Sequence, residues 1–347
     1  MSTTTGTTDV VRVTVGVPTF RRPDDLRALL PLLLEQAAEL GVPGGRYAVD
    51  VLVVDNDPAG SAAATVAEFP VPQLRYAAEP RPGIAAVRNR ALDEAAGSQL
   101  LAMIDDDELP LPGWLDNLVR TWEETRPAAV SGRVLAAFQE ELDPWVAAGE
   151  FFRRRSLPTG TEVGTAAAGN LMLDVQQVRE RGLRFETGLG LSGGEDTLFS
   201  RALVRTGGRI VWCDESAAVD QVPAQRMTRR WVLTRAWSHG NASMLTDLRL
   251  AGGPTARTAL RVRGAGRGLL RLCGGALRWA WGTAGRSHRH QARGLRTSLR
   301  GAGMLCAVLG IVYLEYARPG ERRLRLAGAR LPAAPTAGAP GTTAVTA

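Results

Sequence analysis

The chain has 347 residues, enough for one large or two modest domains with a hydrophobic core, and its composition is that of a globular protein. Its three cysteines are widely spaced, which excludes a disulfide framework and a cysteine-based metal site and suits a reducing compartment. The net charge of +7 is unevenly divided, because residues 226–330 carry a net charge of +18 and the remainder carries −11. The basic segment predicts contact with a polyanion, either a membrane surface or a nucleic acid.

Strands and helices alternate in the predicted secondary structure of the first half. Short apolar runs predict strands at residues 11–17, 49–54, 74–76 and 100–104. Helices are predicted at residues 24–40 and 84–96, and a further helix ends near residue 69. This alternation is typical of a parallel sheet with crossover helices, so we expect an α/β fold.

Four consecutive acids, Asp105-Asp106-Asp107-Glu108, follow the fourth strand. Asp55 follows the second strand, and in a parallel sheet both would lie at the carboxyl edge, where open α/β sheets bind ligands. Crowded carboxylates repel one another, and Mg²⁺ or Mn²⁺ relieves the repulsion by using one or two of them together with phosphates and water. We interpret the stretch as a metal–diphosphate site, and the alternative is a solvated acidic turn before the helix near Trp114.

The middle of the chain predicts further elements of the same core. A helix is predicted at residues 112–126 and a strand at 129–138, followed by an irregular region at 143–165 and a buried strand that ends at residue 173. Glu195-Asp196 then opens a helix to about residue 206, and a last strand covers residues 209–212. The helix dipole favours acids in a first turn by ~0.3–1 kcal/mol, which is the simpler explanation of this pair.

Arginines recur in two predicted helices of the basic segment. The first begins near Arg226 and ends at Ser238-His239-Gly240-Asn241. In the second, at residues 257–281, the arginines fall within one arc of roughly 160°, opposite an apolar side and bordered by two tryptophans. This pattern is typical of a helix lying in a membrane surface, and the alternative is an amphipathic helix packed on the core. Five glycines argue against one continuous helix.

The end of the chain contains its most apolar run, at residues 301–314. This run is shorter than the ~20 residues that cross a bilayer, so we expect it to be buried or to dip into the membrane interface. We expect residues 1–10 and 331–347 to be disordered. The polar N-terminus has no signal-peptide pattern, which favours a cytoplasmic protein.

Six motifs, taken together and in order, resemble those of the family 2 glycosyltransferases, which are inverting GT-A enzymes that use nucleotide sugars. The motifs are Val17-Pro18-Thr19-Phe20-Arg21-Arg22, Val53-Val54-Asp55-Asn56-Asp57, Arg81-Pro82-Gly83 through Ala86-Val87-Arg88-Asn89, Ile104-Asp105-Asp106-Asp107, Ala168-Gly169-Asn170 and Gly194-Glu195-Asp196. The resemblance covers about residues 10–245 and is strongest to bacterial exopolysaccharide enzymes of the succinoglycan type. One departure is Asp55-Asn56-Asp57, where many relatives have two adjacent aspartates.

The resemblance implies a GT-A (Rossmann-like), mostly parallel sheet with flanking helices at residues 11–225. A basic amphipathic helical region, which we expect to associate with membranes, would follow at residues 226–330. Asp107 would hold Mg²⁺ or Mn²⁺, with Asp105 as a second ligand or a contact of the ribose or the sugar. The nucleotide sugar would contact Pro18, Thr19, Arg21, Asp55, Asp57, Arg88, Asp105, Asp106, Arg226 and Arg229.

Catalytic and acceptor roles are implied in the same way. Inversion requires one base that takes the proton of the acceptor hydroxyl, and Asp196 would be that base. Glu195 would orient the acceptor, or act as the base in its place. The residues expected to contact the acceptor are Gly169, Asn170 and Trp231.

The predicted function is metal-dependent transfer of a hexose from a nucleotide sugar, with UDP as the nucleotide expected for the family. The acceptor would be a glycan or a lipid-linked saccharide in cell-surface polysaccharide synthesis. We expect the protein to bind anionic lipids at the inner face of the plasma membrane, and not to bind nucleic acid, because aromatic residues for base stacking are scarce.

Three other functions compete with this prediction. The strongest is a metal-dependent nucleotidyltransferase acting on sugar phosphates, but residues 18–22 lack the glycine of its basic loop. A glycoside hydrolase would also use two carboxylates, yet it would need neither the Asp55 segment nor the basic region. A membrane or nucleic-acid binder without enzymatic activity would explain the basic region alone.

Overall fold

The computed structural model describes residues 10–189, 192–314 and 324–326. The ends predicted to be disordered lie outside the described residues, apart from Val10. In the described part, eight strands form one sheet in the order β3-β2-β1-β4-β7-β6-β8-β5. These strands are β1 Val11–Thr19, β2 Tyr47–Asp55, β3 Leu74–Ala78, β4 Leu100–Ile104, β5 Glu108–Pro110, β6 Ala129–Phe138, β7 Asn170–Asp174 and β8 Ile210–Val222.

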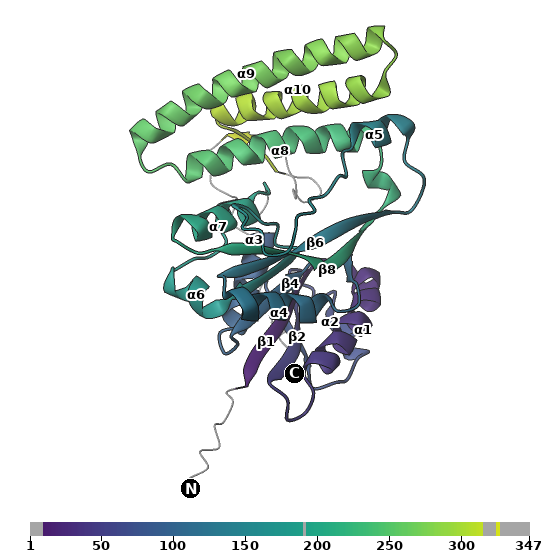
Figure 1. Cartoon of the computed structure of the whole chain (residues 1–347), viewed down its shortest axis with the longest axis vertical. Helices are drawn as coiled ribbons and strands as arrows, with labels where there is room; N and C mark the ends of the chain where they lie inside the picture. The colour runs from purple at the N-terminus through teal and green to yellow at the C-terminus, as the bar shows by residue number, and fades with distance from the viewer. Residues whose placement is uncertain (1–9, 190–191, 315–323, 327–347) are drawn as a thin grey trace, which may run out of the picture.

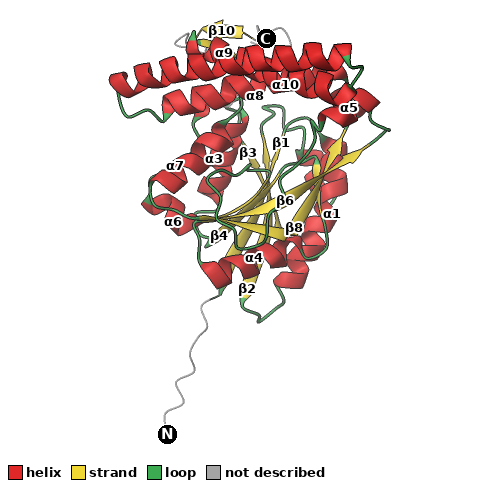
Figure 2. Ribbon diagram, turned by 45° about the horizontal axis from the view of Figure 1, so that its top comes forward, coloured by secondary structure: helices red, strands yellow, loops and turns green. Residues whose placement is uncertain are grey.

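Helices cover both faces of this sheet (Figures 1 and 2). The core helices are α1 Pro23–Leu40, α2 Ala63–Ala67, α3 Ile84–Glu94, α4 Trp114–Thr125, α5 Pro144–Gly149, α6 Val175–Glu180 and α7 Glu195–Arg205. Apolar residues of α1 and α4 pack on one face, and those of α3, α6 and α7 pack on the other. The central strands are therefore buried on both sides, which explains why β4 reads as a continuous apolar run.

The first half of the sheet confirms the predicted alternation. β1 pairs in parallel with β2 and β4, and β2 pairs in parallel with β3. The second half is mixed, because β7 runs antiparallel to both β4 and β6. The prediction of a strand at residues 209–212 was too short, since β8 continues to Val222. Polar residues at positions 214–216 interrupt its apolar run, and β5, its antiparallel partner, was not predicted.

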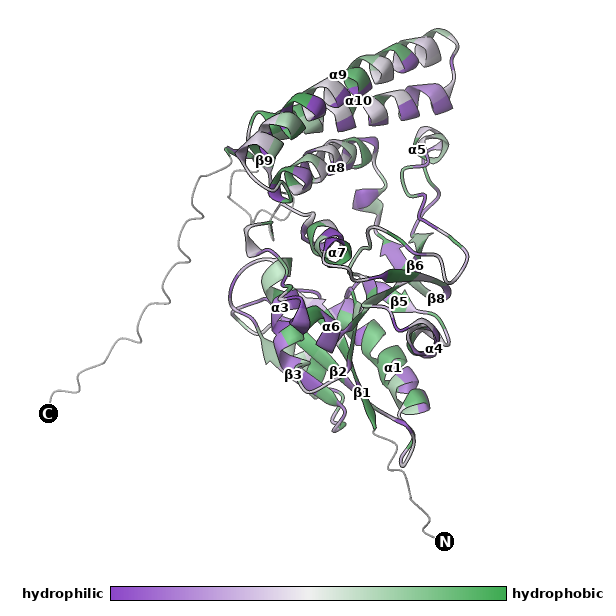
Figure 3. Ribbon diagram, turned by 60° about the vertical axis from the view of Figure 1, so that its left-hand side comes forward, coloured by the Kyte–Doolittle hydropathy of each residue, from purple (hydrophilic) through white to green (hydrophobic). Residues whose placement is uncertain are grey.

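Three long helices lie beyond the carboxyl edge of the sheet: α8 Arg229–Arg249, α9 Pro254–Ala284 and α10 His288–Val308. Figure 3 shows α9 outermost, α10 beneath it and α8 nearest the core. Arg296 of α10 donates to the carbonyls of Gly149 and Glu150, and Arg201 of α7 pairs with Asp247 of α8, so both contacts fasten the helices to the core. A short antiparallel pair, β9 Ile311–Tyr313 and β10 Leu324–Leu326, follows.

Glycines misled the sequence prediction for these helices. The predicted helix end at residues 238–241 was wrong, because α8 continues to Arg249. A β-carbon at Gly240 would overlap the backbone of Arg300, so this glycine lets α10 approach α8 closely. Likewise α9 is one continuous helix of 31 residues. Four of its glycines are buried where it packs on α8 and α10: Gly264, Gly268, Gly275 and Gly282.

The apolar side of α9 points away from the protein. Exposed fractions are 69% for Val262, 75% for Leu270, 73% for Leu277 and 75% for Trp281. Among the described helices, none is long and apolar enough to span a bilayer. Residues 301–314, the most apolar run, are buried or partly buried except for Leu309. This agrees with the first of the two placements that we expected, burial in the protein.

Candidate active site

A cleft of about 750 Å³ lies between the carboxyl edge of the sheet and α8–α10. Most of the site residues predicted from the sequence line it. They are Pro18, Thr19, Arg88, Asp105, Asp106, Asp107, Gly169, Glu195, Asp196 and Arg226.

The four acids form a turn between β4 and β5, in which the amide of Glu108 donates to the carbonyl of Asp105 over 3.1 Å. Asp106 points inward and accepts hydrogen bonds from the Thr19 hydroxyl at 2.8 Å and from Arg22 at 2.7 Å. Burial raises the pKa of Asp106 to about 6. Asp107 lies toward the cleft, 2.8 Å from Arg22 and 3.1 Å from Arg226. The loop after β1 therefore fixes the acidic turn.

Arg88 joins the acidic turn to the start of α7. Its guanidinium donates to Glu195 over 2.6 Å and to Asp105 over 3.1 Å, and its side chain is only 6% exposed. Burial raises the pKa of Glu195 to about 7, against the opposing effect of Arg88. Burial also raises the pKa of Asp105, whose side chain is 35% exposed and lines the cleft.

Asp196 is the more available carboxylate of the Glu195-Asp196 pair. One of its oxygens accepts from the amide and hydroxyl of Thr197. The other oxygen receives no hydrogen bond from the described residues and the side chain lines the cleft. Glu195, by contrast, is 4% exposed and bonded to Arg88. Asp196 is therefore more accessible to a ligand in the cleft than Glu195 is.

The acidic turn has the character of a cation site. Burial and the charges of Asp105, Asp107 and Asp220 raise the pKa of Glu108 well above its usual value. One Glu108 oxygen is buried without a hydrogen-bond partner. Within the described residues no three His, Cys, Asp or Glu side chains are arranged to hold a metal by themselves. A cation bound through Asp105 and Asp107 would thus need ligand phosphates or water to complete its shell, as Mg²⁺ and Mn²⁺ do.

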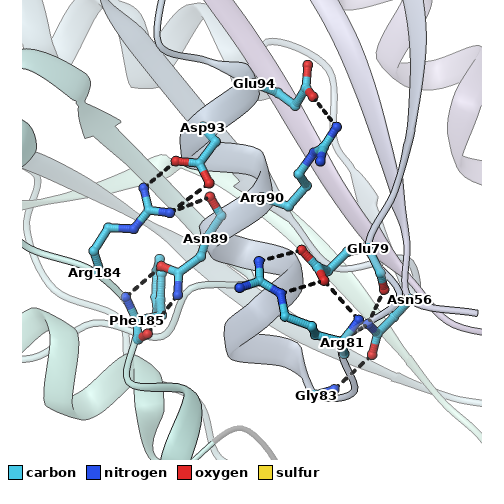
Figure 4. Close-up of polar contacts among 10 residues, drawn as sticks. All are labelled: Asn56, Glu79, Arg81, Gly83, Asn89, Arg90, Asp93, Glu94, Arg184 and Phe185. Carbon is cyan, nitrogen blue, oxygen red and sulfur yellow. Dashed lines mark hydrogen bonds and ion pairs between the residues drawn. The ribbon is translucent and has the colours of Figure 1, made fainter. Parts of the chain in front are cut away.

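Figure 4 shows how α3, which carries Arg88, is held in place. Before the helix, the Asn56 amide donates to the carbonyls of Glu79 and Arg81 and accepts from the amide of Gly83. Next to Arg88, the side chain of Asn89 both donates to and accepts from the backbone of Phe185. The Arg-Asn motif thus combines one residue for the site with one that fixes the loop before α7.

Three residues that were predicted to contact the donor lie outside the cleft: Asp55 and Asp57 of the second motif and Arg21 of the first. The carboxylate of Asp55 is fully buried and accepts from the amides of Asp57 and Ala62 and from the Tyr76 hydroxyl. Asp57 is bonded to Arg21, whose side chain is 62% exposed. The neighbouring residues Arg22 and Asn56 line the cleft in their place.

Three further predicted contacts also serve the fold. Asn170 is 1% exposed and joins α4, β6 and β8 through hydrogen bonds to Trp114, Arg133 and Ser216. Arg229 pairs with Asp143 at 2.9 Å, and Trp231 stacks on Phe152. None of the three lines the cleft. Gly169 does, and a β-carbon there would meet the carboxylates of Asp105 and Glu108.

Several cleft residues were not assigned to the site from the sequence. Glu108 faces Asp220 across the antiparallel pair of β5 and β8, and Arg154 pairs with Asp220. The helical side contributes four more basic residues: Arg235, His239, Arg271 and Arg300. The basic composition of residues 226–330 signalled their charge, but not that they face the acidic turn.

Known proteins were compared with this sequence and structure. The sequence model of Glycosyl transferase family 2 matches residues 14–181. The chain is 30% identical over 311 residues to succinoglycan biosynthesis protein ExoM of Rhizobium meliloti (strain 1021), which covers 88% of this chain and 96% of that protein. The structure of the mannosyltransferase PcManGT from Pyrobaculum calidifontis, in complex with GDP-Man and Mn²⁺, has a TM-score of 0.52 at 19% identity and covers 83% of this chain and 86% of that chain. This likeness confirms the predicted fold class.

Proposed function

Because this chain belongs to glycosyl transferase family 2 and is a glycosyltransferase, we propose that it transfers a hexose with inversion from a nucleotide sugar to an acceptor hydroxyl. The observation that carries the proposal is one cleft holding both the acidic turn and Asp196, close enough that the charge of Asp196 raises the pKa of Asp105. Family membership favours this reaction over nucleotidyl transfer to a sugar phosphate. UDP is the nucleotide that we propose.

The donor would lie against the sheet edge, with Pro18 and Thr19 beside the nucleotide and Arg226 beside the diphosphate. Asp107 and Asp105 would hold Mg²⁺ or Mn²⁺, which neutralises the charge of a leaving nucleoside diphosphate. Asp196 would remove the proton of the acceptor hydroxyl as the new glycosidic bond forms. Arg88 would keep Glu195 and Asp105 in place, because it bonds to both.

Thermal unfolding with a panel of nucleotides tests the donor site. We expect one of UDP, GDP, dTDP and CMP to stabilise the protein in the presence of Mn²⁺ or Mg²⁺ and not in EDTA. A ligand at a hundredfold excess over Kd adds ~2.7 kcal/mol of stability, which is readily measured. Asp107→Asn should lose the metal-dependent part of this stabilisation, while Asp116→Asn, on the exposed surface of α4, should keep it. The absence of stabilisation by every nucleotide and metal would contradict the proposal.

The acceptor that we propose is a glycan or lipid-linked saccharide used in the synthesis of cell-surface polysaccharide. Support comes from the relative of 30% identity, which is a succinoglycan biosynthesis protein. The outer side of α9 gives a second reason, because Val262, Leu270, Leu277 and Trp281 are exposed there between arginines. We therefore propose that α9 lies on the anionic inner face of the plasma membrane, with the apolar side chains in the interface and the arginines near the headgroups.

Sedimentation with liposomes tests this placement. The full-length protein should sediment with vesicles containing anionic lipid at low salt, and less so at high salt, because salt screens exposed charges. The double variant Leu270→Asp, Leu277→Asp should bind at least tenfold more weakly, since each leucine loses about 1.5–3 kcal/mol of apolar burial. Val42→Asp is the control, because Val42 is 52% exposed and lies outside α9. Equal sedimentation of the double variant and the wild type would refute a role for α9.

A further inference from the structure

The helical side of the cleft is basic, opposite in charge to the acidic turn. Four residues from three helices meet there: Arg235 and His239 of α8, Arg271 of α9 and Arg300 of α10. Arg154, from the loop after α5, is near enough that its charge, with those of Arg235 and Arg300, acts on His239. We call Arg235, His239, Arg271 and Arg300 the basic wall.

Two arginines of the basic wall have no carboxylate partner in the described part of the chain. Arg22, Arg88, Arg154 and Arg226, which line the same cleft, each pair with an Asp or Glu. In contrast, no ion pair is formed by Arg271 or Arg300 within the described residues. Arg271 contacts the sulfur of Met304, and the Nε of Arg300 is buried without a hydrogen-bond partner.

The electrostatics of the basic wall agree with this geometry. Burial, together with the charges of Arg296 and Arg271, lowers the pKa of Arg300. Neighbouring side chains that partly bury His239 and the charges of the surrounding arginines lower its pKa, although the residue is exposed at the cleft. Positive charge in a partly desolvated cavity is costly unless an anion compensates it. This cost applies to Arg300, which is partly buried and for which the described residues provide no such anion.

We propose that the basic wall binds a phosphate or diphosphate group carried by the acceptor. This inference rests on the proposed function, because it takes the acidic edge as the donor site and leaves the helical side to the acceptor. Guanidinium groups from separate helices suit a phosphate, since each can donate two hydrogen bonds to its oxygens. The basic wall would then hold the acceptor by its phosphate, at a distance from the acceptor hydroxyl that reacts.

The course of α8 supports this arrangement. Its cleft-lining residues run from Arg235 and His239 to Ser243 and Thr246. Thr246 lies beside Gly194, and Gly194 is the residue that immediately precedes Glu195 and Asp196 in the chain. Eleven residues of helix correspond to about 16 Å. An acceptor with its phosphate at Arg235 would therefore extend along α8 and present a hydroxyl near Asp196.

Isothermal titration of the full-length protein with pyrophosphate in EDTA tests the basic wall without the metal-dependent donor site. Arg271→Gln and Arg300→Gln should each weaken pyrophosphate binding at least tenfold, because each removes charge-assisted hydrogen bonds. Arg289→Gln, at the exposed start of α10, is the matched control and should change binding less than twofold. Arg271 is exposed on α9, so its replacement tests the site even if Arg300→Gln does not fold.

Binding of UDP with Mn²⁺ is measured on the same variants and should not change. Absence of UDP binding by the wild type would overturn UDP as the donor nucleotide and leave the basic wall untouched, whereas unchanged pyrophosphate binding in both glutamine variants would overturn the basic wall. An equal loss in Arg289→Gln would also overturn it, because attraction would then be nonspecific. A short prenyl diphosphate identifies the source of the group: tighter binding than pyrophosphate indicates a lipid headgroup, and equal binding indicates a phosphate on a soluble acceptor.

Discussion

Replacement of Asp196 by asparagine is expected to reduce sugar transfer by about 10²- to 10⁴-fold, the contribution typical of a positioned general base. Asparagine has nearly the same shape but cannot take the proton of the acceptor hydroxyl. Binding of the nucleotide with Mn²⁺ should stay within about twofold, because the base does not contact the donor phosphates in this mechanism. Initial rates and thermal stabilisation by the nucleotide, measured on the same preparation, separate the two effects.

Asp116→Asn is the matched control for this variant. Asp116 lies in the first turn of α4, as Asp196 lies in the first turn of α7, so both substitutions remove the same favourable interaction with a helix dipole. Only the Asp196 variant should lose activity. If Asp196→Asn kept near-normal turnover, the base would lie elsewhere, and Glu195→Gln would be the next variant to measure.

The second large effect is expected for Arg88→Met. The substitution leaves the buried Glu195 and the partly buried Asp105 without their shared cation. Removal of one partner from a buried ion pair typically lowers the free energy of unfolding by about 3–5 kcal/mol. Arg90→Met, two positions along α3, should cost less than about 0.5 kcal/mol, since the Arg90 side chain is 40% exposed and pairs with Glu94 one turn away (Figure 4). Urea denaturation of both variants measures the difference.

The free energy of unfolding of Arg88→Met, measured as a function of pH, reports on the ionisation of Glu195. Its pKa in the folded protein is about 7, above the value of about 4.3 expected in the unfolded chain. Loss of Arg88 should raise the folded pKa further. Above pH 7 the folded variant holds a proton that the folded wild type has released, so the stability deficit of the variant should be smallest below pH 7 and should grow as the pH rises past 7. A deficit independent of pH would indicate lost packing rather than lost charge compensation.

Much of the core and of the acidic side of the cleft could be predicted from the sequence. β1 to β4 are local apolar runs with turn signals between them, and acids at the end of a parallel strand must lie at the sheet edge. Asp55 and Asn170 were also assigned to the site, but they do not line the cleft. A motif identifies a position in the chain and not the direction of its side chain. Hydrogen bonds to nearby backbone and side-chain groups turn both into the core.

The helical side could not be predicted in the same way. Gly240 and the glycines of α9 look like helix-breaking residues until the neighbouring helix is known. Arg271 and Arg300 share a cavity only because α9 and α10 fold over the sheet, and no local pattern in the sequence records that arrangement. The amphipathic pattern at residues 257–281 did predict α9, but the side of α9 that packs on α10 is lined by glycine rather than by its large apolar residues.

The glycine contacts among α8, α9 and α10 also fix the separation of the arginines above the cleft. A β-carbon at Gly303 would overlap the backbone of Trp237, and one at Gly301 would overlap that of Gly268, so alanine at either position would force the helices apart. The size of the anion that fits between Arg235, Arg271 and Arg300 is therefore determined by residues that never touch it. Redesign of the acceptor preference would have to begin with the spacing of α8, α9 and α10. New charged side chains on helices with unchanged spacing would still lie the same distance from one another.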